Sequence, residues 1–131
     1  MKNFAVIAAL LMPATPIYAD ISDRVSVTNC KFNEIINQWM DCSITNHTDT
    51  AILSVEVKHI YTQEGRAVPW VDTTNEPRPY STGKIAGGVE PGETIEHLVR
   101  TPGISSRADV EIVDFQVTPI KATLANGEIL E

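Results

Sequence analysis

The segment Ala51-Ile-Leu-Ser-Val-Glu-Val-Lys-His-Ile-Tyr61 decides the fold, because apolar and polar side chains alternate along it. On an extended strand, successive side chains point to opposite faces of the sheet. We therefore predict a long strand with one buried face and one face in water. The residues expected on the buried face are Leu53, Val55, Val57, His59 and Tyr61.

Two further strands are predicted upstream, over Arg24–Lys31 and Trp39–Asn46. Each contains one of the two cysteines of the chain, Cys30 and Cys42, which allow one intramolecular pairing. A redox pair is the alternative, but redox cysteines are usually spaced C-x-x-C. We predict a structural disulfide that pins this first hairpin, worth about 3 kcal/mol in the chain-entropy model.

Turn signals follow the long strand. The glycine within Gln63–Arg66 suits a tight hairpin turn, so Ala67–Val71 is predicted as the return strand. Because this strand contains Pro69, which has no N–H to donate, we place it at a sheet edge. The segment Asp72–Pro79 has few apolar residues and is predicted to be an irregular loop.

The next strand pair is predicted to form between Ser81–Ala86 and Thr94–Arg100. The connection contains Pro91–Gly92, which suits the two central positions of a type II turn, because proline fixes φ near −65° and glycine accepts a positive φ. These two strands are therefore expected to be neighbours in one sheet.

The last strands are predicted over Ala108–Val117 and Lys121–Ala125, the latter pairing with the final residues through a type I′ turn at Asn126–Gly127. Short strands separated by turn signals, with no helical period, predict an all-β fold. We expect residues 20–131 to form one immunoglobulin-like antiparallel β-sandwich of about seven strands with one disulfide.

The first 19 residues have the layout of a cleavable signal peptide. Lys2 gives the positive start, Phe4–Met12 the apolar run and Ala19 the cleavage site; a buried N-terminal helix is the alternative. The apolar run of about nine residues is too short to span a bilayer, which takes roughly 20. We expect a periplasmic or secreted domain with no membrane insertion.

The charge balance is acidic. The chain has 10 Lys and Arg against 17 Asp and Glu, for a net charge of −7. The acidic residues are scattered rather than grouped, which is typical of a solvated surface. This balance does not attract nucleic acid, so we expect no nucleic-acid partner.

The segment Cys42-Ser-Ile-Thr-Asn-His-Thr-Asp49 and the strand after it resemble the core of small bacterial immunoglobulin-like domains of the FxLYD type. The matching positions of that strand and its turn are Ile52, Val55, Val57, Tyr61 and Gly65. Val89-Glu-Pro-Gly-Glu-Thr94 is similar to the L-x-P-G-E turn of the same family. The resemblance covers residues 24–100, although the F-x-L-Y-D motif is absent and the disulfide is additional. It implies an exported or surface module and carries over no functional residues.

Three histidines are the candidates for activating a nucleophile or binding a metal, namely His47, His59 and His97. His59 and His97 lie on the apolar sides of their strands. If these strands are neighbours, the two imidazoles could hold copper or zinc with Glu93 or Glu96 as a third ligand. The alternative is that both histidines lie at the rim of the core and hydrogen-bond to backbone. His47 is expected in an exposed turn.

No motif specifies a reaction. Serine-hydrolase, metalloprotease and phosphate-loop patterns are absent, and Glu93 and Glu96 would face opposite sides of a strand. We therefore expect neither enzymatic activity nor a cofactor.

Two aromatic residues are candidates for partner binding, Trp70 on the predicted edge strand and Tyr80 after the proline-rich loop. The alternative for Trp70 is that it closes one end of the core. The function predicted first is an exported, non-enzymatic interaction module that binds a protein or surface partner by a strand edge or loop tip. The alternatives are a periplasmic copper or zinc protein and an accessory or inhibitor subunit of a secreted enzyme.

Overall fold

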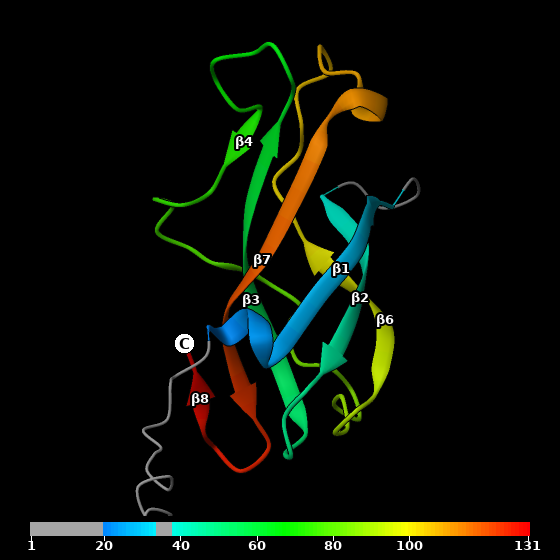
Figure 1. The fold of residues 1–131 in the computed structure, drawn as a ribbon, viewed down its shortest axis with the longest axis vertical. Coiled ribbons are helices and arrows are strands. Elements are labelled where there is room, and N and C mark those ends of the chain that lie inside the picture. Colours follow the sequence, from blue (N-terminus) through cyan, green and yellow to red (C-terminus); the bar gives the residue numbers. More distant parts are fainter. Residues whose placement is uncertain (1–19, 34–37) are drawn as a thin grey trace, which may run out of the picture.

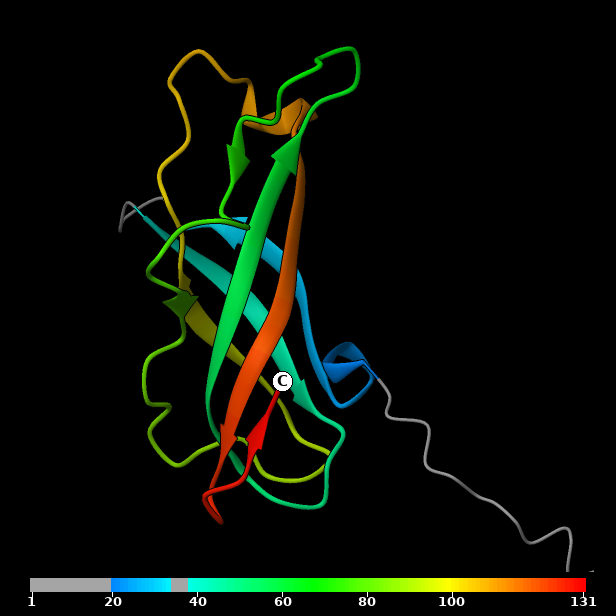
Figure 2. The same cartoon turned by 90° about the vertical axis from the view of Figure 1, so that its left-hand side faces the viewer.

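The computed structural model describes residues 20–33 and 38–131, and the predicted signal peptide at residues 1–19 lies outside them. Two antiparallel sheets are stacked face to face (Figures 1 and 2). The strands are β1 (Val25–Phe32), β2 (Trp39–Asn46), β3 (Ile52–Thr62), β4 (Val71–Asp72), β5 (Tyr80–Ser81), β6 (Thr94–Arg100), β7 (Asp114–Leu124) and β8 (Ile129–Leu130). Two short 3-10 helices are η1 (Ile21–Asp23) and η2 (Val110–Ile112).

The strand order confirms the predicted sandwich. One sheet has the order β1-β2-β6, and the other has the order β4-β3-β7-β8, with β5 also paired to β3. Because β4 and β5 pair with different parts of β3, they are two halves of one interrupted edge strand. The chain therefore forms an immunoglobulin-like sandwich of seven strand positions. In the described part of the chain, no helix is long and apolar enough to cross a membrane.

The central strand β3 lies where the alternation predicts it, with one correction at its start. Ile52 is fully buried, whereas Leu53 is only half-buried. The register with β7 shifts between Ile52 and Ser54, so a bulge at Leu53 reverses the facing of the first residue. From Val55 onward, the buried face is the predicted one.

The edge beside β3 differs most from the prediction. Residues 67–70 are not a strand, and β4 begins only at Val71. The predicted strand Ser81–Ala86 is also wrong, because β5 ends at Ser81 and pairs with β3. Its predicted partner β6 pairs instead with β2 in the other sheet. The chain thus changes sheets between β5 and β6, and local turn signals do not reveal this change.

Two threonines continue the edge where β4 and β5 stop. The N–H of Thr73 donates to the carbonyl of His59, and the hydroxyl of Thr73 accepts from the N–H of His59 (3.0 and 2.9 Å). Thr82 makes the same two contacts with Val55 (2.9 and 3.0 Å). In the hydrogen-bond ladder along β3, each threonine hydroxyl therefore takes the place of a backbone carbonyl. The buried N–H groups of His59 and Val55 both have an acceptor.

The turn at Pro91–Gly92 is confirmed. The N–H of Glu93 donates to the carbonyl of Glu90 at 2.9 Å, and Gly92 has a φ of +79°. These are the features of a type II turn.

The final strands need two corrections. Residues 110–112 form η2, and a single strand, β7, replaces the two predicted ones. The pairing of β7 with β3 shifts register between Glu56 and Val57, next to Pro119. The terminal hairpin is not of type I′, because Gly127 has a positive φ and Asn126 does not. Gly127 instead closes a three-residue loop, donating to Leu124 at 3.0 Å.

The disulfide is confirmed and joins neighbouring strands, as predicted. Cys30 on β1 is bonded to Cys42 on β2. The pairing of these strands shifts between Thr28 and Lys31, and Asn29 has a φ of +53°, which marks a bulge. The extra residue brings Cys30 opposite Cys42.

The core lies between the two sheets and contains one aromatic group. The ring of Phe32 on β1 meets those of Tyr61 on β3 and Phe115 on β7 edge to face, with centroids 6.1 and 5.2 Å apart. The fully buried apolar side chains include Val25, Met40, Ile44, Ile52, Val55, Val57, Tyr61, Val89, Val99 and Leu124. The core therefore contains residues from strands of both sheets, as a sandwich requires.

Candidate functional site

The first loop at the upper end of the sandwich is the segment 63–70 between β3 and β4 (Figure 1). It begins with the predicted turn, in which the N–H of Arg66 donates to Gln63 at 3.0 Å and Gly65 has a φ of +88°. It ends at Trp70, whose N–H donates to the carbonyl of Tyr61 at 2.8 Å. The indole Nε1 of Trp70 also donates to Oε1 of Gln63 at 2.9 Å. The tryptophan is thus fixed at both its backbone and its ring.

The second loop at this end is the segment 101–113 between β6 and β7, which includes η2. The hydroxyl of Ser105 accepts from the N–H of Arg107 at 3.1 Å, and the Ser105 carbonyl accepts from Ala108 at 3.0 Å. The carboxylate of Asp109 accepts from the N–H of Glu111 at 3.0 Å and so caps η2. Local bonds therefore hold the loop that presents Arg107.

The two loops meet at Trp70. The guanidinium carbon of Arg66 lies 3.7 Å from the centroid of the indole ring, and that of Arg107 lies 5.4 Å from it. Both distances are within the range of cation–π attraction. Trp70 is half-buried and packs against the core, so it both closes this end of the sandwich and supports two exposed arginines.

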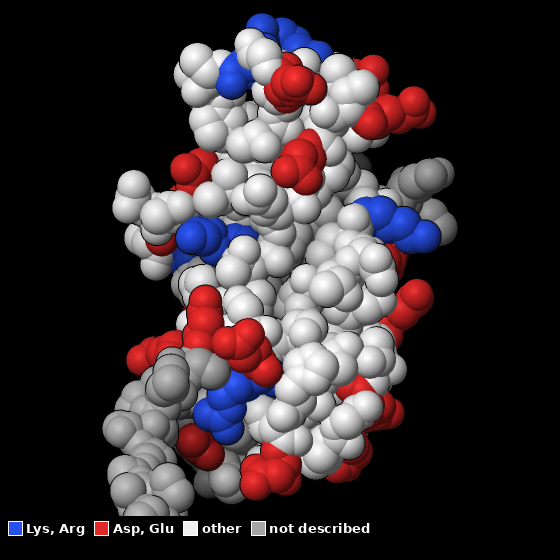
Figure 3. Space-filling model, viewed as in Figure 1, with Lys and Arg blue, Asp and Glu red and all other residues white. Residues whose placement is uncertain are grey.

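Exposed apolar side chains lie on the same two loops. The sandwich has five large apolar residues that are well exposed in the described part of the chain, and three of them belong to these two loops: Val68 at 67%, Val110 at 48% and Ile112 at 58%. Figure 3 shows Lys or Arg atoms at the same end of the molecule, while acidic residues are spread over the face. We define the apical surface as Arg66, Val68, Trp70, Arg107, Val110 and Ile112.

Tyr80, the second predicted binding residue, lies in a different place. Tyr80 pairs with Val57 on β3. The strand that follows Trp70 pairs with β3 at Tyr61, four residues farther along. Its hydroxyl donates to Oε1 of Glu76 at 3.0 Å. Burial raises the pKa of Tyr80, and the Glu76 carboxylate raises it further. Among the described residues, no ring contact or hydrogen bond joins Trp70 and Tyr80, so the two candidates lie at separate places on the surface.

A groove of about 450 Å³ lies beside Tyr80 under the loop 73–79. It is lined by the acidic Glu56 and Glu76, the basic Lys58 and Arg78, and Ile120. The charges of both signs balance one another, and the groove shares no lining residue with the apical surface.

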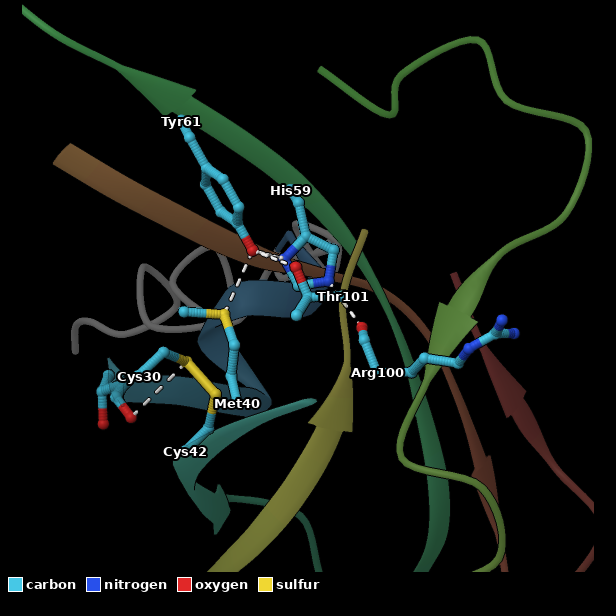
Figure 4. The surroundings of a disulfide bond; sticks show 8 residues. Cys30, Met40, Cys42, His59, Tyr61, Arg100 and Thr101 are labelled. Carbon is cyan, nitrogen blue, oxygen red and sulfur yellow. Dashed lines mark hydrogen bonds between the residues drawn. A yellow bond between two sulfur atoms is a disulfide. The ribbon is translucent and has the colours of Figure 1, made fainter. Parts of the chain in front are cut away.

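A buried polar network occupies the core below the upper loops (Figure 4). His59 is fully buried on β3, and its Nε2 lies 2.8 Å from the carbonyl oxygen of Arg100. Its Nδ1 lies 2.8 Å from the hydroxyl of Tyr61, which also contacts the hydroxyl of Thr101 and, at 3.1 Å, the sulfur of Met40. The network thus links the two sheets, since Met40 is on β2.

The partners decide the state of this histidine. A carbonyl oxygen only accepts, so Nε2 of His59 carries the proton, and the bare Nδ1 accepts from Tyr61. Burial lowers the pKa of His59, more than the bond to Arg100 and the Glu76 carboxylate raise it. Burial likewise raises the pKa of Tyr61 well above its usual range. Both side chains are therefore neutral and hydrogen-bonded inside the protein, with no nitrogen open to a substrate.

The histidines do not come together as a metal site. His97 is half-buried on β6, in the sheet opposite β3, and its Nε2 lies 3.4 Å from the carbonyl of Thr82. The condition for a pair with His59, neighbouring strands, is not met. Within residues 20–33 and 38–131, no three His, Cys, Asp or Glu side chains are grouped as metal ligands. Both imidazoles instead bond to backbone carbonyls, as the alternative expected, although His59 is fully buried rather than at the rim of the core. His47 is exposed as predicted.

Compared with protein-family models, curated proteins and solved structures, the chain has no match. The resemblance to the FxLYD type therefore stays a prediction.

The sequence analysis identified Trp70 but missed its neighbours. Arg107 is separated from Trp70 by three strands and their connections, so only the folded chain brings them together. Val110 and Ile112 had been assigned to a strand, where both would have pointed to the same face of a sheet. The acidic Glu111 between them, with Asp109 ahead of it as a helix cap, is the local signal for the short helix.

Proposed function

We propose that this chain is an exported, non-enzymatic immunoglobulin-like module that binds a protein partner through its apical surface. The observation that carries the proposal is the position of Trp70, fixed by the core and by Gln63, with an arginine on its ring and exposed apolar side chains on the same two loops. Tryptophan and arginine are the residue types most enriched at binding hot spots.

The surroundings of Trp70 strengthen the proposal. Exposed Val68, Val110 and Ile112 leave apolar area in water, and an apolar patch rimmed by charged residues is typical of a protein interface. The argument for binding rests on the residues themselves.

The covalent structure supports the proposed compartment. The Cys30–Cys42 disulfide is typical of a protein that folds outside the reducing cytoplasm. Together with the signal-peptide pattern of residues 1–19, this supports the periplasm or the extracellular space as the place where the partner is met.

The test is capture of a partner from the exported proteins of the producing cell, using the purified disulfide-bonded domain as bait. Trp70→Ala should reduce capture about thirtyfold, which corresponds to a hot-spot loss of about 2 kcal/mol. Trp39→Ala is the matched control, because Trp39 is a half-buried tryptophan on β2 in the other sheet.

The outcomes separate the possibilities. A partner lost with Trp70→Ala but kept with Trp39→Ala supports the proposal, and its identity will show whether it is a secreted enzyme. Equal capture by both variants, or loss only with Trp39→Ala, rules out the apical surface. Circular dichroism and thermal unfolding of both variants check that each is folded.

A further inference from the structure

We infer that Arg66 and Arg107 form a two-arginine site for carboxylate groups, so that the partner presents acidic side chains within an apolar surface. This inference rests on the proposed function, since it names the chemistry that the apical surface recognises.

The first step is that neither guanidinium group has an ion pair or a side-chain hydrogen bond within the described part of the chain. In the described part of the chain, the one ion pair joins Lys121 and Glu131. Neither Arg66 nor Arg107 donates a side-chain hydrogen bond to a described residue. An arginine carries five N–H donors in a planar fork that matches a carboxylate. Both forks thus lie against one indole ring with their donors open.

The second step is that the two forks are positioned in advance. Both lie over the same indole ring, at 3.7 and 5.4 Å from its centroid. The ring is fixed by the bonds from Trp70 to Tyr61 and Gln63. Because the contact with the ring restricts the long arginine side chains, less conformational entropy is lost when an anion binds.

The third step decides the class of anion. Glu64, Asp109 and Glu111 are exposed on the same two loops and would repel a dense polyanion such as nucleic acid or an anionic bilayer. Exposed Val68 and Ile112 favour a partner with an apolar surface opposite them. A protein that presents one or two carboxylates among apolar residues meets both conditions.

The experiment uses Trp70 as its own reporter. The chain has two tryptophans, so Trp39→Phe leaves Trp70 as the only one. The folded, disulfide-bonded Trp39→Phe protein is titrated with glutarate at constant ionic strength, with acetate as the single-carboxylate comparison. We expect a saturable change in Trp70 fluorescence with a dissociation constant on the order of 1 mM, as two charge-assisted contacts at an exposed site allow.

The variants separate a fork from a simple charge. Arg66→Gln and Arg107→Gln should each weaken glutarate binding about tenfold, as loss of one charge-assisted contact predicts. Arg66→Lys should weaken it as well, because lysine keeps the charge but has no planar fork. No saturable change up to about 50 mM, far above the expected constant, would overturn the site. So would an unchanged titration in the Arg66→Gln, Arg107→Gln double variant.

Partner capture distinguishes this inference from the proposed function. If Trp70→Ala loses the partner and the double glutamine variant keeps it, the apical surface remains and the carboxylate site is wrong. If both variants lose the partner and the glutamine variant also loses glutarate, the two proposals stand together. Arginine-dependent binding to phosphatidylglycerol vesicles in place of glutarate would assign the surface to a lipid headgroup and overturn the inference.

Discussion

The hydroxyl of Tyr61 lies 2.8 Å from Nδ1 of His59, so two residues on the same face of β3 satisfy each other inside the core. The other nitrogen of His59 donates to the Arg100 carbonyl, at the end of a strand in the opposite sheet. This pair therefore ties the two sheets together directly below the loops that carry the apical surface.

The buried histidine should make the stability of the domain fall in acid. The pKa of His59 is lowered in the folded state, whereas in the unfolded chain it is near 6.5, the usual value for a histidine. As the pH falls below about 6.5, the unfolded chain takes up a proton first, so stability decreases until the lowered folded-state pKa is reached and then levels off. Between these two pKa values the slope should approach about 1.4 kcal/mol per pH unit.

Urea unfolding between pH 7.5 and the onset of acid denaturation measures this slope. The His59→Gln variant should have a lower free energy of unfolding than the wild-type protein. Its stability should also no longer decrease with the slope that protonation of His59 causes below pH 6.5. His47→Gln, which removes an exposed imidazole, should keep it. Identical slopes in the wild-type protein and His59→Gln would contradict the account.

Removal of the Tyr61 hydroxyl should be costly. Tyr61→Phe leaves Nδ1 of His59 buried without a donor, and an unsatisfied buried polar group costs about 1–3 kcal/mol. Tyr80→Phe removes a hydroxyl that bonds to the exposed Glu76, and it should change stability by less than about 0.5 kcal/mol. Urea unfolding at neutral pH compares the two, and equal losses would show that the buried network contributes nothing special.

The disulfide should stabilise the folded domain by restricting the unfolded chain. Cys30 and Cys42 are 12 positions apart, and closure of a loop of this length is worth about 3 kcal/mol in the chain-entropy model. The Cys30→Ser, Cys42→Ser double variant should lose about that much. Intact mass of the native domain, with and without reductant, must show the gain of two hydrogens on reduction. A native protein that already carries both thiols would refute the bridge.

A close backbone contact should make Gly88 intolerant of substitution. A Cβ atom there would lie 2.9 Å from the carbonyl oxygen of Ile52, and Gly88 has a φ of +66°. Gly65 also has a positive φ, +88°, but its Cβ position is open. Gly65→Ala should therefore cost about 1–2 kcal/mol from the backbone conformation alone, and Gly88→Ala clearly more. Thermal unfolding of both variants tests this, with the opposite ranking as the contradicting result.

The sequence was sufficient for the parts of the fold that depend on local patterning. The bounds of β2 are those predicted, and β3 differs by one residue at each end, because alternation is a property of the strand itself. The disulfide was predictable because two cysteines allow only one pairing. These are short-range or combinatorial constraints.

The rest depends on contacts that are distant in sequence. Thr73 and Thr82 extend a strand edge with side-chain oxygens, and nothing in their neighbourhood indicates that they face His59 and Val55. The pairing of β6 with β2 rather than with the segment before it is likewise a long-range choice. For the same reason, only part of the candidate site could be predicted. Trp70 was singled out by its residue type and its position on the predicted edge strand, but its contact with Arg107 was not predicted.

The most direct test of the central claim is site-specific photo-crosslinking in the producing cell. A photoreactive phenylalanine analogue is placed at Val110, in the apical surface, and separately at Ile129 on β8; the two residues are about equally exposed (48% and 51%). Strand β8 lies toward the other end of the sandwich (Figure 1). We predict a discrete adduct with one exported protein from position 110, lost on Trp70→Ala, and none from position 129. An adduct from position 129 alone, or one from position 110 that survives Trp70→Ala, would contradict the claim that the apical surface binds the partner.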